Sequence, residues 1–116
     1  MRYFPLLWLL VVPVLGLAQP CSGTISNLKM ESYGANQITI SWSSSGTPAG
    51  YEVRYGPSGS ITAGGKDTTL SSPYTITGLN PNFDYDIQVR DSCSATSKGS
   101  WSSSLSIQTA CNPVKA

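Results

Sequence analysis

Three aspartates in the second half of the chain are the side chains best suited to chemistry, because Asp84, Asp86 and Asp91 lie close together in the sequence. Grouped carboxylates can bind calcium or act as a paired general acid and base. In an extended segment Asp84 and Asp86 would share one face, about 7 Å apart, with Arg90 nearby. No oxygen-rich loop with cation-binding spacing surrounds them, and an acid–base pair also needs a cleft. We therefore expect no metal, no cofactor and no catalytic residue.

The absence of histidine narrows the chemistry further. Ser-His-Asp and Cys-His catalytic arrangements are excluded, as are zinc sites that use histidine. Chemistry by carboxylates alone, or with the help of a lysine, stays formally open. The composition therefore favours a protein that is not an enzyme.

The N-terminal segment predicts export. Arg2 gives a short positive start, residues 4–17 are almost wholly apolar, and Gly16 and Ala18 are small residues at a cleavage site. We expect a signal peptide over residues 1–18, cleaved after Ala18, and a secreted or cell-surface protein.

Two other membrane attachments are weaker alternatives for this segment. Pro5 and Pro13 interrupt an apolar run that is shorter than the roughly 20 residues needed to cross a bilayer. A lipid anchor is also disfavoured, because Pro20 occupies the position before Cys21 where a lipidation signal has a small residue. The mature chain is expected to have no membrane span.

Charge and cysteine content limit the partners and the compartment. Removal of Arg2 from the seven basic residues leaves six against six acidic ones, so the mature chain is formally neutral. No broad positive field exists to attract nucleic acid or an anionic membrane. Three cysteines in an exported chain indicate one disulfide and one remaining thiol.

Alternating apolar and polar residues predict short β-strands. The clearest is 84–93, in which Tyr85, Ile87 and Val89 share one face. Pro81 fits only before this strand, because proline inside it would remove a hydrogen-bond donor from the ladder. The spacing of Leu79, Pro81 and Tyr85 resembles the tyrosine corner of β-sandwich domains, in which the tyrosine hydroxyl bonds to the backbone of the preceding turn.

The remaining expected strands are separated by loops rich in Ser, Gly and Pro. They cover residues 21–30 at a sheet edge, 37–42, 51–55, a short piece around Ile61, 73–77 and 101–109. Seven short strands without a helical period indicate an all-β, seven-stranded, immunoglobulin-like antiparallel sandwich. The side chains expected to form the core between its sheets are Trp42, Tyr51, Val53, Tyr55, Tyr85, Ile87, Val89, Leu105 and Ile107.

Several of these segments together resemble a fibronectin type III domain. They are Trp42, the segment 51–56, the corner 79–85, the Val89-Arg90 pair and the Trp101-Ser102 pair. The resemblance covers residues 21–109 and is closest to the variety found in secreted bacterial multidomain enzymes and adhesins. In that variety a cysteine opens the module, a second follows the Val-Arg pair, and a Trp-Ser pair precedes the last strand.

The resemblance implies the domain limits and the disulfide. We expect the domain over 19–110, and the start of a linker or further module over 111–116, because the sequence around Cys111 echoes that around Cys21. In a fibronectin-type sandwich the first strand begins at the pole where the strand ending near Cys93 terminates. The resemblance therefore implies a Cys21–Cys93 disulfide and a free Cys111 at the opposite pole.

The polar face of strands 51–55 and 84–93 supports two interpretations. Its charges form solubilising cross-strand pairs, or the face contacts a protein through Arg54, Arg90 and Trp101, with Arg90 stacked on Trp101 as a cation–π pair. Cytokine receptors share the fold and carry a Trp-Ser-x-Trp-Ser motif. Only Trp101-Ser102 is present here, so a receptor is poorly supported.

The function implied by the resemblance is a non-catalytic extracellular spacer or interaction module, forming the N-terminal part of a larger secreted or surface protein. Its partners would be adjacent modules, or an extracellular protein or glycan, and the chain would be a monomer. The alternative is a small free-standing secreted binding protein that uses the loops 43–50 and 94–100. The second loop lacks the integrin-binding Arg-Gly-Asp tripeptide of some fibronectin modules.

Overall fold

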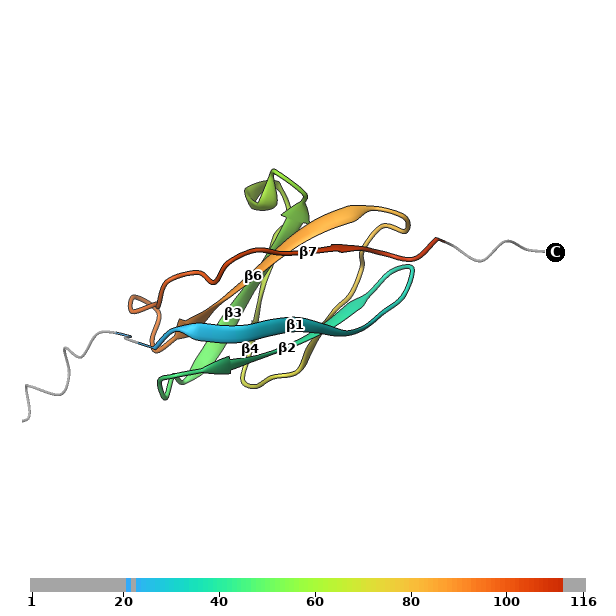
Figure 1. The fold of residues 1–116 in the computed structure, drawn as a ribbon. Helices are drawn as coiled ribbons and strands as arrows, with labels where there is room; N and C mark the ends of the chain where they lie inside the picture. The colour runs from blue at the N-terminus through green and yellow to red at the C-terminus, as the bar shows by residue number, and fades with distance from the viewer. Residues whose placement is uncertain (1–20, 22, 112–116) are drawn as a thin grey trace, which may run out of the picture.

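The computed structural model describes residue 21 and residues 23–111 as two antiparallel β-sheets packed face to face (Figure 1). The expected signal peptide and residues 112–116 lie outside the described residues. One sheet has three strands in the order β1-β2-β5, and the other has four in the order β4-β3-β6-β7. The strands are β1 (Ile25–Tyr33), β2 (Ile38–Ser44), β3 (Gly50–Pro57), β4 (Gly65–Thr69), β5 (Tyr74–Ile76), β6 (Asp84–Ser92) and β7 (Leu105–Gln108). The expected seven-stranded sandwich is confirmed.

Alternation along the strands decides which side chains enter the core. On β2, Ile38, Ile40 and Trp42 are buried, whereas Thr39 and Ser41 lie on the other face. Val53 of β3 faces them and is fully buried. Each buried aliphatic side chain stabilises the fold by roughly 1.5–3 kcal/mol of apolar burial.

The core differs in part from the expected set. Tyr51, Tyr55, Leu105 and Ile107 are only partly buried and pack against its rim. Two of them lie on β7, an edge strand of the larger sheet, and the two tyrosines stand near the ends of β3. Five expected residues are buried in the core: Trp42, Val53, Tyr85, Ile87 and Val89. The core also contains four residues that were not in the expected set: Ile38, Ile40, Ile76 and Leu79.

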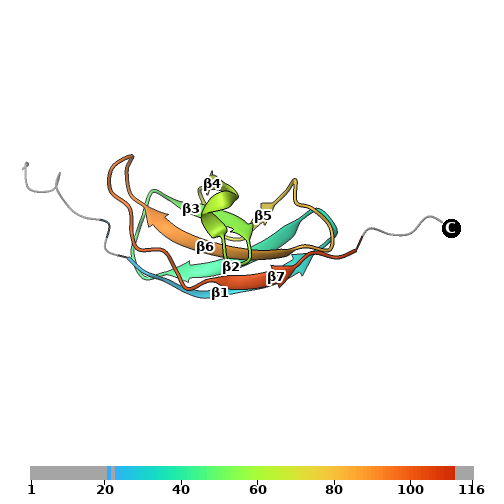
Figure 2. The same ribbon diagram turned by 90° about the horizontal axis from the view of Figure 1, so that it is seen from above.

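The short strand expected around Ile61 is wrong. Ile61–Ala63 form the 3-10 turn η2, and the strand of this region is β4, which begins only at Gly65 (Figure 2). The cause is close backbone packing at Gly64, where an added Cβ would collide with the carbonyl group of Tyr55 and the Cα of Gly56. Only glycine allows this approach, so the chain turns before it pairs with β3.

The last strand is shorter than expected, since β7 begins at Leu105 and not at Trp101. Ser102 explains the difference. Its backbone N–H donates to Val89 O at 2.9 Å, but its side-chain Oγ accepts from Val89 N at 3.0 Å. A hydroxyl therefore takes the place of a backbone carbonyl, and the ladder is interrupted beside β6.

The turn before β6 has the geometry of a tyrosine corner. Tyr85 Oη accepts a hydrogen bond of 2.8 Å from the backbone N–H of Asn80, and Tyr85 is 6% exposed. Leu79 is buried beneath the same turn, and Pro81 lies three residues before the first residue of β6. Gly78 enters the turn with a φ of 73°, a conformation that favours glycine.

The disulfide between Cys21 and Cys93 is confirmed, with 5.6 Å between the two Cα atoms. It joins the segment before β1 to the residue that follows β6. Cys111 is free and exposed. The two ends of the described chain lie at opposite ends of the sandwich (Figure 1), so Cys111 is far from the disulfide.

Candidate functional site

The outer face of the four-stranded sheet holds the arrangement that resembles a binding site most. Two arginines lie over Trp101, with the Cζ atoms of Arg54 and Arg90 each 4.3 Å from the centroid of its ring. The two guanidinium groups therefore both stack on the indole ring. Such cation–π contacts contribute about 0.5–1 kcal/mol each when exposed, and more when desolvated.

Arg54 is positioned by β3 and by a neutral partner on β6. Its Nε and Nη2 donate to Gln88 Oε1 at 2.9 and 2.6 Å, because Arg54 and Gln88 are paired across the two strands. No carboxylate in the part of the chain that the structure describes lies within ion-pair distance of Arg54. The amide orients this guanidinium without neutralising it.

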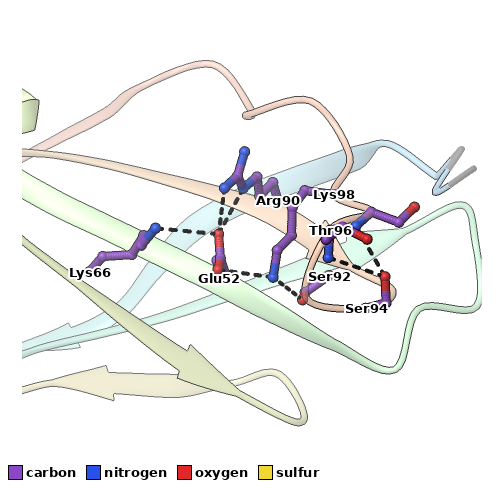
Figure 3. A network of polar contacts seen from close by, with 8 residues as sticks. Glu52, Lys66, Arg90, Ser92, Ser94, Thr96 and Lys98 are labelled. Atoms are coloured by element: carbon purple, nitrogen blue, oxygen red, sulfur yellow. Dashed lines mark hydrogen bonds and ion pairs between the residues drawn. The ribbon is translucent and has the colours of Figure 1, made fainter.

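Glu52, by contrast, is surrounded by cations (Figure 3). Its carboxylate lies 2.7 Å from Arg90 Nη2, 3.2 Å from Lys98 Nζ and 3.9 Å from Lys66 Nζ, and its side chain is 8% exposed. Burial by itself acts to raise the pKa of Glu52, but the hydrogen bonds and charges of Arg90 and Lys98 outweigh it and hold this pKa below its ordinary value.

The two clusters adjoin at an open depression of about 300 Å³, bounded by η2 on one side and Trp101 on the other. Arg54, Lys66 and Arg90 line it, together with Gly64 and Gly65, and its lining contains no carboxylate. Three of the six basic residues that follow the expected cleavage site therefore line this one depression. The depression can accept an anionic group.

Sequence reasoning placed Arg54, Arg90 and Trp101 on one face, and the structure brings all three together. Lys66 and Lys98 were not among the expected contact residues. Lys66 was missed because β4 was not recognised after the two glycines. Lys98 was missed because no pattern in a polar loop predicts that its amine reaches Glu52.

The three aspartates do not form a site. Asp91 is 1% exposed, and its carboxylate accepts a hydrogen bond of 2.9 Å from the Ser44 hydroxyl. Asp86 accepts from Ser58, from Ser106 and from the backbone N–H of Gly59, which lowers its pKa. Within residues 23–111 and residue 21, no group of three His, Cys, Asp or Glu side chains is placed to share a metal ion.

The loops 43–50 and 94–100, expected to form a binding pole, make most of their hydrogen bonds with residues of the same pole. Ser45 N–H donates to Thr24 O, and the Ser45 hydroxyl accepts from Thr24 N–H, which joins the first of these loops to the segment before β1. In the second loop Ser94 Oγ accepts from the backbone N–H groups of Thr96 and Ser97. Their polar groups serve the turns themselves more than a ligand.

The fold and this surface define the class of protein: an immunoglobulin-like antiparallel β-sandwich with a charged sheet face and no catalytic constellation among its described residues. The sequence matches the model of the fibronectin type III domain over residues 23–108, and the chain belongs to this family. Domains of this family are typically non-catalytic modules of larger proteins.

Solved structures with the same fold come from several animal proteins. The fibronectin type III domain of the human collagen alpha-1(XX) chain has a TM-score of 0.67 and 22% identity, covering 79% of this chain and 89% of its own. The FN5 domain of Drosophila Lar has a TM-score of 0.63 and 21% identity, with coverage of 79% and 98%. The FN1-FN3 domains of chicken CNTN1 have a TM-score of 0.66 and 19% identity.

The coverage of these neighbours differs. The match to the chicken FN1-FN3 fragment covers 79% of this chain but only 31% of that fragment. No curated protein sequence matches the chain. Within the described residues no helix is long and apolar enough to span a membrane.

Proposed function

We propose that this chain is a non-catalytic interaction module of an exported protein, and that it contacts its partner through the outer face of the four-stranded sheet. The observation that carries the proposal is the stack of Arg54, Trp101 and Arg90. The stack orients two guanidinium groups before any partner arrives, and preorganised side chains lose less entropy on binding. Arg and Trp are also the residue types that dominate binding energy at interfaces.

Export is supported by two independent features. The N-terminal sequence has the charge, apolar run and small residues of a signal peptide, with cleavage after Ala18. The Cys21–Cys93 disulfide is typical of oxidising compartments, where such bonds form and persist. We propose that the domain, residues 19–110, is the N-terminal part of a larger secreted or surface protein, and that 111–116 begin a linker or further module.

The cysteine positions also support a finer assignment within the family. Cys21 opens the module, Cys93 follows the Val-Arg pair, and Trp101-Ser102 precede β7. We propose that the module is of the variety found in secreted bacterial enzymes and adhesins.

The alternative, a free-standing binding protein that uses loops 43–50 and 94–100, has less support. These loops carry few aromatic or arginine side chains, and much of their hydrogen-bonding capacity is used within the pole. The sheet face places two arginines on an aromatic ring, and Arg54 has no carboxylate partner among the described residues, so this face is the better candidate.

Fractionation of the producing cells tests the export part of the proposal. We expect the protein outside the cytoplasm, with an intact mass that lacks residues 1–18. Alkylation without reduction should modify one thiol, that of Cys111. Retention in the cytoplasm, or three reactive thiols in the native protein, would contradict it.

Replacement of Trp101 by Leu tests the face. Its partner would be sought in the same extracellular fraction by crosslinking, with Tyr33→Ser as the control, because Tyr33 is 53% exposed on the other sheet. We expect Trp101→Leu to reduce the crosslinked product and Tyr33→Ser to leave it unchanged. Equal product from both variants would place the contact elsewhere.

A further inference from the structure

We infer that the depression beside Trp101 binds a carboxylate of an acidic, extended peptide segment, and that this segment adds to the free edge of β4. The inference rests on the proposed function and names the chemistry of the partner. Four observations support it: the charge of the depression, the free donors of Arg54, the guanidinium groups stacked on Trp101, and the position of β4 in the sheet.

The charge around the depression is unbalanced. Arg90, Lys98 and Lys66 all lie within 4 Å of Glu52, which is the single carboxylate that they share. Arg54 adds a fourth cation, held by the neutral amide of Gln88. An anion placed among these groups would gain attraction, and the charge of Glu52 cannot neutralise all of them.

Arg54 defines the shape of the anion. Its Nε and one Nη2 hydrogen are used by Gln88, and its other N–H groups have no acceptor within the residues that the structure describes. A planar guanidinium binds carboxylate groups through two parallel hydrogen bonds. Lys66 also lines the depression, and its side chain is 52% exposed, so its amine can turn toward the same anion.

Trp101 argues against a sugar chain as the ligand. Carbohydrate rings commonly pack on an open aromatic face, but the guanidinium groups of Arg54 and Arg90 already lie over this indole. A sulfated polysaccharide would thus find cationic side chains here but no free aromatic ring on which its sugars could stack. A peptide needs no such platform, because it can bind through its backbone.

Backbone groups for a peptide are available at β4. This strand is the edge of the four-stranded sheet and pairs only with β3, so alternate N–H and C=O groups of Gly65–Thr69 face outward. Lys66 sits on this strand opposite Arg54, so an added strand would run beside the cations. Leu70, at the end of β4, is 83% exposed and offers an apolar contact.

Strand addition explains how one peptide uses both features. Main-chain hydrogen bonds to β4 supply affinity, and alternate side chains point to the same face. Glutamates at alternate positions would therefore lie on the outer face, where Lys66 and Arg54 are found. Specificity for acidic residues follows from their charge.

The test uses the purified, oxidised protein and a fluorescent octapeptide with Glu and Thr in alternation, followed by fluorescence anisotropy. We expect binding that weakens as salt is added. Lys66→Gln should weaken it about fivefold and Arg54→Gln about tenfold or more. Lys29→Gln is the matched control, because Lys29 is an exposed lysine on the other sheet, and it should bind like the wild type.

Two further arms examine the mode and the class of ligand. Amide hydrogen exchange of residues 65–69 should slow when the peptide is bound. If Arg54→Gln fails to fold, Lys66→Gln still tests the site, because the side chain of Lys66 is half exposed and its replacement should not disturb folding. A sulfated oligosaccharide of equal charge is the competing ligand, and a Lys-Thr peptide is the negative control.

The outcomes are distinct. Tighter binding of the sulfated oligosaccharide, binding that survives both substitutions, unchanged exchange at β4, or no binding at all would each overturn the inference. A negative result here would leave the export of the protein and the crosslinking result of the proposed function standing, since those measurements do not use the acidic peptide.

Discussion

The carboxylate of Glu52 lies 2.7 Å from the guanidinium of Arg90, and the two residues are paired across β3 and β6. Glu52 Oε1 also accepts a 2.8 Å hydrogen bond from Arg90 Nε, so Arg90 contacts the carboxylate with two nitrogen atoms. The same guanidinium covers Trp101. Glu52 therefore fixes one side of the stack on which the candidate site depends.

Replacement of Glu52 by Gln is expected to lower the free energy of unfolding by roughly 1–3 kcal/mol, because charge-assisted hydrogen bonds in a buried position are lost. Urea unfolding at pH 7 measures the effect. Glu31→Gln is the matched control, since Glu31 is 45% exposed and 3.8 Å from Lys29, and such surface pairs contribute about 0–1 kcal/mol. Equal losses in both variants would show that Glu52 does not hold the cluster.

Acid should remove the contribution of Glu52. Its pKa in the folded protein is lowered from 4.5, so the folded state favours the charged carboxylate. The stabilisation is present above the unfolded pKa and is lost as the pH falls through the lower, folded pKa. The difference in urea midpoint between wild type and Glu52→Gln should shrink below pH 4.5. A constant difference across this range would contradict the lowered pKa.

Alkali should act through Tyr74, which joins the two sheets. Its hydroxyl donates a 2.9 Å hydrogen bond to Asp67 of β4, and burial, followed by this hydrogen bond and the charge of Asp67, raises the pKa of Tyr74 from 10.0 to about 12. A raised pKa gives stability that is present below pH 10.0 and is lost as the pH rises through about 12.

Comparison with Tyr74→Phe isolates this effect. Between roughly pH 9 and 12 the contribution of the Tyr74 hydroxyl should be lost. Over this range the free energy of unfolding should therefore fall more in the wild type than in Tyr74→Phe. Thermal or urea unfolding at each pH gives the two curves. Parallel curves would assign the alkaline loss to other groups.

Tyr85→Phe should destabilise the sandwich by roughly 1–3 kcal/mol, since the Asn80 N–H loses its acceptor in a partly buried turn. The measurement is the urea midpoint. Peptide binding at the sheet face should be unchanged, because Tyr85 points into the core. An unaltered midpoint would mean that water replaces the hydroxyl at no cost.

Removal of the disulfide by Cys21→Ala together with Cys93→Ala should cost about 4 kcal/mol in the chain-entropy model, because the two cysteines are 72 residues apart. Chemical unfolding of the double variant checks the size of the loss. Cys111→Ala is the control and should change stability little, since this thiol is free and exposed. A large loss in the control would reveal a role for Cys111 that the fold does not show.

Sequence patterns were sufficient where a local rule applies to each residue. Alternation placed Ile38, Ile40 and Trp42 on one face of β2, because neighbouring side chains in a strand point to opposite sides. The spacing from Leu79 to Tyr85 indicated the corner, because its hydrogen bond spans only a few residues. The same rules failed at Ile61, where a turn depends on contact between Gly64 and the distant backbone of Tyr55.

Tertiary structure decided the site. The sequence alone determined that strands 51–55 and 84–93 carry charged faces, and that Arg90 and Trp101 could meet. It did not determine that Arg54 also stacks on Trp101, or that Lys66 and Lys98 converge on Glu52. Those contacts depend on the register of β3 with β4 and β6 and on the path of the 93–104 segment. Register is set by the packing of all strands together, and no single segment encodes it.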